Sequence, residues 1–177
     1  MIRTGQAPLV SVVMSVHNGR PYLAHAVESI LEQTFRDFEF IIIDDGSTDG
    51  STDDLAENAK RDDRIRLFIQ QNCGLATALN GGLKLARGKY IARMDADDVA
   101  HPDRLMAQTE LMTHEPNLVL LGTAFEYVDS IERHLKHQPV STDNATLQLR
   151  LIEECNQFCH PSVMMRVRSV RDLGGYR

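Results

Sequence analysis

The stretch YIARMDADD, residues 90–98, runs from a short apolar segment directly into three carboxylates, Asp95, Asp97 and Asp98. Carboxylates a few ångströms apart repel each other by roughly 4 kcal/mol per pair at an effective dielectric near 20, and a bound divalent cation removes this cost. Oxygen ligands favour magnesium, manganese or calcium over zinc or copper. A solvated acidic turn that caps the following helix is the alternative, and this stretch alone leaves it open.

The apolar part of this stretch is one of four β-rich runs that alternate with helical patterns. Such alternation is typical of an α/β fold with a mostly parallel sheet flanked by helices. Two of the runs are almost continuously apolar, which predicts strands covered on both faces. Gly81 and Gly82 interrupt a predicted helix, and their propensity cost indicates a close approach by another backbone. The predicted strands are residues 9–16, 38–43, 65–69 and 89–94, and the predicted helices begin at Pro21, after a cap at Ser51, and at Leu75.

The second part of the chain has a less regular pattern. Pro102 opens a predicted helix that Pro116 closes, and residues 118–121, 125–128 and 162–167 are strand candidates. A further helix is predicted over 143–155, with Leu147, Leu151 and Ile152 available for burial. Residues 130–144 are polar and are predicted to be at most a mobile excursion. The length and composition predict one domain over residues 1–177.

Charge and composition exclude several classes of partner. The net charge of -6 gives no broad attraction to nucleic acid or to anionic lipid. No segment approaches the ~20 apolar residues that span a bilayer, and the first residues lack the layout of a signal peptide, so we expect a cytoplasmic protein. The three cysteines do not suggest a disulfide framework, and a zinc site of Cys155, Cys159 and His160 lacks an evident fourth ligand.

Polar residues gather where the predicted strands end. Ligands of open parallel α/β sheets bind outside the carboxyl ends of the strands, so these residues are expected to converge on one crevice if the strands are adjacent. The residues concerned are Ser15, His17 and Asn18 after the first strand, Asp44 and Asp45 after the second, and Asp95, Asp97 and Asp98 after the fourth.

Several motifs together resemble the catalytic domain of the inverting family-two nucleotide-sugar glycosyltransferases, which have the GT-A fold. The matching stretches cover essentially the whole chain in order: VSVVMSVHN (10–18), SILEQTF (29–35), DDGSTD (44–49), GKYI (88–91), DADD (95–98), HPS (160–162) and GGYR (174–177).

The resemblance implies a role for each matching position. Ser15, His17 and Asn18 are expected to line the nucleotide pocket, and Asp45, with Asp44 beside it, to accept a hydrogen bond from a ring imide N–H, which favours uracil or thymine over cytosine. Asp95 is expected near the ribose, and Asp97 on an Mn²⁺ or Mg²⁺ ion bound to the diphosphate. Asp98 is expected to orient the donor sugar.

The implied activity is metal-dependent sugar transfer, with inversion, from a UDP-sugar to a polysaccharide or lipid-linked acceptor in bacterial cell-envelope assembly. The resemblance also places the full-length protein at the inner face of the cytoplasmic membrane. Inversion requires a general base, which the family provides shortly beyond the position of Arg177. We therefore expect the chain to lack its acceptor portion and to bind nucleotide with little transfer.

Three alternatives compete with this interpretation. The loop DGSTDG (45–50) partly follows an EF-hand, although its twelfth position is Ala56 and not Glu. A nucleotidyltransferase would also bind nucleotide and metal, but it normally has a glycine-rich phosphate loop, which residues His17 to Arg20 resemble only weakly. A domain that keeps the fold without catalysis is the third.

Overall fold

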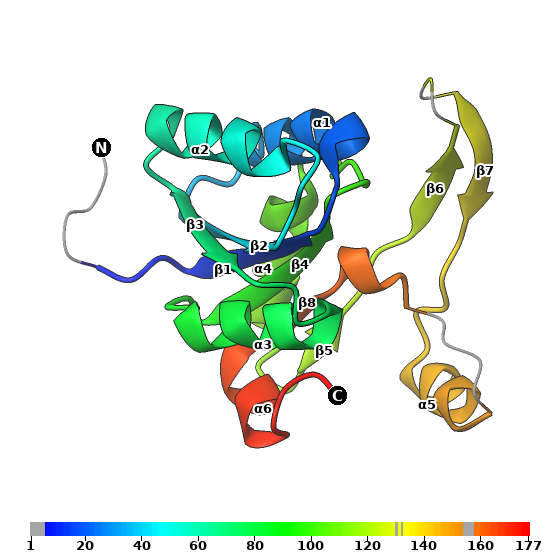
Figure 1. Cartoon of the computed structure of the whole chain (residues 1–177). Helices are drawn as coiled ribbons and strands as arrows, with labels where there is room; N and C mark the ends of the chain where they lie inside the picture. Colours follow the sequence, from blue (N-terminus) through cyan, green and yellow to red (C-terminus); the bar gives the residue numbers. More distant parts are fainter. Residues whose placement is uncertain (1–5, 130, 132, 154–157) are drawn as a thin grey trace.

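The computed structural model describes residues 6–129, 131, 133–153 and 158–177. Strands and helices alternate through the first part of the chain, as predicted (Figure 1). The strands are β1 (Val10–Val16), β2 (Phe38–Asp45), β3 (Ile65–Gln70), β4 (Tyr90–Asp95), β5 (Leu120–Leu121), β6 (Phe125–Val128), β7 (His134–Gln138) and β8 (Met164–Arg166). The helices are α1 (Arg20–Leu31), α2 (Ser51–Arg61), α3 (Leu75–Leu85), α4 (Arg104–His114), α5 (Asn144–Ile152) and α6 (Val167–Asp172), with a 3-10 turn, η1, at His160–Ser162.

The central sheet has the strand order β3-β2-β1-β4-β8-β5. Strands β1 to β4 are parallel, whereas β8 runs antiparallel to both β4 and β5. In this register Ser15 lies opposite Asp95, and Val16 lies opposite Asp44, so the three strands end at nearly the same level. The predicted α/β fold with a mostly parallel sheet flanked by helices is confirmed.

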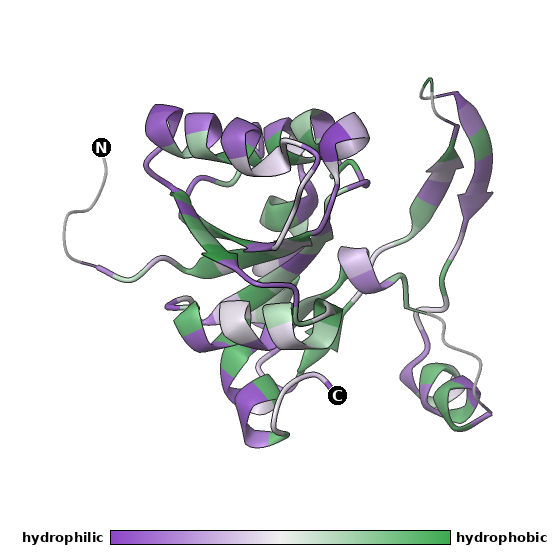
Figure 2. Ribbon diagram, viewed as in Figure 1, coloured by the Kyte–Doolittle hydropathy of each residue, from purple (hydrophilic) through white to green (hydrophobic). Residues whose placement is uncertain are grey.

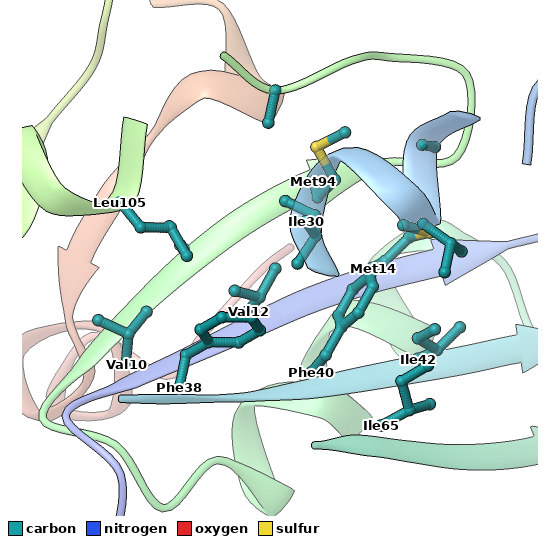
Figure 3. Packing of buried hydrophobic residues seen from close by; sticks show 14 of the residues in the cluster. Val10, Val12, Met14, Ile30, Phe38, Phe40, Ile42, Ile65, Met94 and Leu105 are labelled. Carbon is teal, nitrogen blue, oxygen red and sulfur yellow. The ribbon is translucent and has the colours of Figure 1, made fainter. Parts of the chain in front are cut away.

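Successive side chains of the central strands point to opposite faces, and helices cover both faces. Met14 and Phe40 belong to the cluster on the face covered by α1, α2 and α4 (Figure 3). Val13 and Ile41 belong to the cluster on the other face, which α3 and α6 cover. This double coverage explains why β1 and β2 are almost continuously apolar, and Figure 2 shows the hydrophobic colour concentrated in these strands.

The start of α2 differs from the prediction by one residue. Ser51 is the first helical residue and not the cap, which is Gly50 in a left-handed conformation with φ of 93°. Asp49 supplies the side chain instead, because its Oδ1 accepts a hydrogen bond of 2.9 Å from the Ser51 backbone N–H. The Ser51 prediction failed because Asp49, one position before the cap, reaches the same unpaired N–H.

The two glycines of α3 have different surroundings. A Cβ at Gly82 would overlap Cγ1 of Val13, whereas the nearest atom to a Cβ at Gly81 is 4.0 Å away. The close approach predicted from these glycines therefore involves Gly82 alone. The contacting group is a side chain of β1 and not a backbone segment.

A polar network closes the amino edge of the sheet, opposite the strand ends. Glu39 is 3% exposed, accepts a 2.7 Å hydrogen bond from Ser11 Oγ, and pairs with Arg66 at 2.6 Å and Arg87 at 2.9 Å. Burial by itself would raise the pKa of Glu39, but the bonds from Ser11, Arg87 and Arg66 lower it overall.

Strands β6 and β7 and helix α5 form a second region with different packing. Strands β6 and β7 pair only with each other and project away from the central sheet (Figure 1). Residues 134–138 were predicted as part of a mobile excursion, and that prediction is wrong, because they form β7. No residue of α5 is buried, so the expected burial of Leu147, Leu151 and Ile152 is also wrong.

Among the helices of the described residues, none has the length and apolar character needed to cross a bilayer.

Candidate functional site at the carboxyl edge of the sheet

Three strand ends meet at one edge, as the sequence predicted. Because β1 lies between β2 and β4 and is parallel to both, Ser15, Asp45 and Asp95 all fall at the carboxyl edge. Strand spacings of about 4.8 Å put β2 and β4 roughly 10 Å apart, a span that one ligand can bridge. The edge is therefore a suitable place for a polar ligand that contacts all three strands.

The loop after β1 is tied to the loop after β2. Asn18 has a positive φ of 55°, its N–H donates to Ser47 Oγ at 3.0 Å, and its Oδ1 accepts from the Thr48 N–H at 2.8 Å. His17 Nδ1 lies 3.0 Å from the Asp45 carbonyl oxygen, and Asn72 Nδ2 lies 3.2 Å from His17 Nε2. The imidazole is exposed, and these contacts hold it in position.

Asp44 is fully buried at the end of β2. Its Oδ1 accepts a 2.9 Å hydrogen bond from the Ser47 N–H, and its Oδ2 accepts one from Thr52 Oγ1. Both oxygens thus stabilise the β2–α2 connection. In this structure Asp44 is buried and both of its carboxylate oxygens are engaged within the loop, whereas its expected role beside the nucleotide stays a prediction.

Asp45 is 2% exposed and is held by a segment that sequence analysis did not identify. Its Oδ1 accepts from Gln70 Nε2 at 2.6 Å and from the Cys73 N–H at 2.9 Å, and its Oδ2 accepts from the Gly74 N–H at 2.9 Å. Burial alone would raise its pKa, but these hydrogen bonds lower the pKa overall. The one signal for this segment was Gly74, between a predicted strand and a predicted helix.

Asp95, Asp97 and Asp98 form a compact acidic cluster at the end of β4. One carboxylate oxygen from each lies within 4.8 Å of the others, and Asp97 is the exposed member. Burial, followed by repulsion from Asp95 and Asp97, raises the pKa of Asp98. Three hard oxygen donors at this separation fit a divalent ion such as Mn²⁺ or Mg²⁺.

Two buried arginines lie beneath this cluster. Arg93, which the sequence placed only in a strand, forms an ion pair through Nη1 with Asp95 Oδ2. Arg104, on α4, donates from Nη2 to the Arg93 carbonyl oxygen at 2.8 Å and from Nε to Gln108 Oε1 at 3.1 Å. Burial lowers the pKa of Arg104 to about 10, so it stays charged at neutral pH. Sequence patterns did not identify either residue as part of the site.

The last residues of the chain return to the same edge. Asn80 Nδ2 donates to the Tyr176 carbonyl oxygen and Asn80 Oδ1 accepts from the Tyr176 N–H, both at 2.8 Å. The ring of Tyr176 meets His160 edge to face, with centroids 5.5 Å apart. Burial, assisted by the nearby charge of Arg93, lowers the pKa of His160, whose imidazole is therefore neutral at pH 7.

One of the alternative metal sites does not fit the geometry. In the EF-hand alternative Asp45 would be the first ligand, but amide groups occupy its oxygens and a strand precedes it. The zinc alternative requires Cys155, which lies outside the described residues. Asp172, at the end of α6, has a side chain that is 71% exposed, pairs with Arg168, and is not a member of the acidic cluster.

Comparison with known proteins agrees with this fold. The profile of Glycosyl transferase family 2 matches residues 11–174. The putative glycosyltransferase EpsE of Bacillus subtilis is 35% identical over 173 residues, which cover 96% of this chain and 60% of EpsE.

Two solved structures share the fold. S. aureus TarS 1-349 in complex with UDP-GlcNAc has a TM-score of 0.77 at 19% identity, and it covers 94% of this chain and 48% of that protein. The mannosyltransferase PcManGT from Pyrobaculum calidifontis, in complex with GDP-Man and Mn²⁺, has a TM-score of 0.73 at 20% identity, over 98% of this chain and 48% of that one. The chain thus spans 60% of EpsE and about half of each solved relative. It belongs to glycosyl transferase family 2.

Proposed function

We propose that the carboxyl edge of β2, β1 and β4 binds a nucleotide-diphosphate sugar together with Mn²⁺ or Mg²⁺, for transfer of the sugar with inversion to a glycan or lipid-linked acceptor. The observation that carries the proposal is the acidic cluster, whose oxygens lie within 4.8 Å of one another beside β1. The relatives are longer than this chain, so transfer and its location at the inner membrane face are proposed for the whole protein.

The nucleotide end of the donor belongs at Asp45. Its Oδ1 already accepts two hydrogen bonds, whereas Oδ2 accepts one and keeps a free acceptor position for a uracil imide N–H. Because Asp45 is 2% exposed, the base reaches Oδ2 only when the segment 70–74 shifts. His17 offers the exposed ring beside the base, and Ser15, opposite Asp95, lines the floor toward the ribose.

The diphosphate end belongs at the acidic cluster. A divalent cation there acts as a Lewis acid on the developing charge of the nucleotide diphosphate. Asp97, the exposed member, would hold the cation, and Asp98, which is half-buried, would orient the donor sugar with one carboxylate oxygen and offer the other to the cation. The proton acceptor for the attacking hydroxyl is not assigned to any of these residues.

Two relatives support the class of donor. PcManGT is described with GDP-Man and Mn²⁺, and TarS with UDP-GlcNAc, so both are seen with nucleotide sugars but with different bases. The choice of UDP for this chain rests on Asp45 and not on these relatives. Family membership disfavours a nucleotidyltransferase, and the intact Asp45, Asp95 and Asp97 disfavour a domain without catalysis.

Calorimetric titration of UDP, with and without Mn²⁺, tests the proposal. We expect binding that requires the metal and that Asp97→Ala weakens by at least about tenfold, because a cation ligand is lost. Asp172→Ala removes one exposed carboxylate far along α6 and serves as the matched control, with affinity unchanged. CDP in place of UDP should bind more weakly, because cytosine has no ring imide N–H to donate to Asp45. Equal UDP binding by the wild type and Asp97→Ala, with or without Mn²⁺, would overturn the proposal.

A further inference from the structure

Arg93 is a buried cation directed at the acidic cluster. Its side chain is 3% exposed, and its Nη1 forms an ion pair with Oδ2 of Asp95, which is 29% exposed. The contact meets the distance of an ion pair but not the angles of a hydrogen bond, and Nε has no hydrogen-bond partner among the described residues. The positive charge of the Arg93 guanidinium is therefore balanced by the carboxylate of Asp95.

Arg104 is satisfied in a different way. Its donors go to neutral acceptors, the Arg93 carbonyl oxygen and Gln108 Oε1. It contributes a charge near Asp98 but occupies no carboxylate oxygen in the described structure. Of these two buried arginines, only Arg93 forms an ion pair with an acid of the cluster.

The energetics favour keeping Arg93 and Asp95 together. A buried guanidinium without an opposite charge costs several kcal/mol, so moving Asp95 away to ligate a cation would leave Arg93 uncompensated. Within the described part of the chain, Asp97 and Asp98 form no ion pair with Arg93; Asp98 interacts with the charges of Arg93 and Arg104 only through space. A divalent ion held by two carboxylates keeps open positions, which substrate phosphates normally fill.

We propose that Arg93 is a positioning residue that reserves Asp95 for the nucleotide side, so that Asp97 and Asp98 are the only carboxylates left for the cation. This inference rests on the proposed function. It has the consequence that the free metal binds weakly and becomes firmly held only with the donor diphosphate. Removing the charge of Arg93 releases Asp95 as a third ligand and strengthens binding of the free metal.

The test measures Mn²⁺ affinity by electron paramagnetic resonance of the unbound ion, without nucleotide. We expect Arg93→Met to raise the affinity by about tenfold, because a nearby positive charge is lost and Asp95 is released. In the D95N background the same change should raise it by no more than about threefold, since only the through-space effect remains. Arg93→Lys keeps the charge and should leave the affinity close to that of the wild type.

Arg66→Met is the matched control, because it removes an arginine paired with a buried acid, Glu39, at the opposite edge of the sheet. It should leave Mn²⁺ affinity unchanged. If circular dichroism shows that Arg93→Met is unfolded, Arg93→Gln takes its place with the same expected increase. No increase on loss of the charge, or equal increases in both backgrounds, would overturn the role of Arg93. Metal-dependent UDP binding by the wild type is measured separately, so the proposed function stands or falls on its own result.

Discussion

The central sheet and the region formed by β6, β7 and α5 both contain apolar residues, but only the central sheet buries most of them. All eight residues of β2 are buried, whereas α5 has apolar residues at helical spacing and buries none of them. The difference lies in what surrounds each element, because β2 has strands on both sides and helices on both faces, while β6, β7 and α5 stand apart from the sheet (Figure 1). An apolar pattern predicts an element, but a neighbouring layer decides whether that element is buried.

The largest expected effect compares one side chain from each region. Phe40→Ala, in fully buried β2, should lower the free energy of unfolding by about 3–5 kcal/mol, because it leaves a cavity in the core. Leu149→Ala, on α5, should change it by less than about 0.5 kcal/mol, since Leu149 is 59% exposed. Denaturant unfolding of both variants measures this contrast. Losses of similar size would break the comparison between the two regions.

A smaller effect is expected at the binding edge itself. In Asp45→Asn an amide NH₂ group replaces a carboxylate oxygen and faces N–H donors such as those of Gln70 and Gly74. Because two donors cannot bond each other, the free energy of unfolding should fall by roughly 1–3 kcal/mol at pH 7. The lowered pKa of Asp45 means that its contribution is complete above the ordinary value of 3.8 and is lost as the pH falls through the folded-state pKa.

The difference in stability between wild type and Asp45→Asn should therefore shrink in acid. Denaturant unfolding at pH 7 and near pH 3 tests this. A constant difference would mean that the ionised carboxylate does not stabilise the fold.

The smallest expected effect separates two neighbouring glycines. Gly81→Ala should stabilise the protein by up to about 1 kcal/mol, because the helix gains propensity and the site is open. Gly82→Ala gains the same propensity but overlaps Val13, so we expect a net loss of up to about 2 kcal/mol. Melting temperatures of the two variants should move in opposite directions. A shift of both upward would show that α3 packs more loosely on β1 than the structure describes.

Sequence patterns predicted β1 to β4 well because continuous apolar runs and punctuation by Gly and Pro are local signals. They also predicted that the strand ends would meet, since parallel order follows from the alternation of strands and helices. They could not identify Arg93 or Gln70, because an interior ion pair or a carboxylate clamp depends on contacts between distant segments. The burial predicted for Ile152 failed for the same reason, since none of the described elements packs closely enough on α5 to bury its residues.

The central claim is that the ends of β1, β2 and β4 form one site for a cation and a nucleotide diphosphate. Amide chemical shifts of the isotope-labelled protein, recorded while Mg²⁺ and UDP are added together, test it most directly. The account predicts shifts at residues 15–18, 44–47, 72–74 and 95–98, and none at 125–128 or 134–138. Shifts confined to one strand end, or concentrated in β6 and β7, would contradict it.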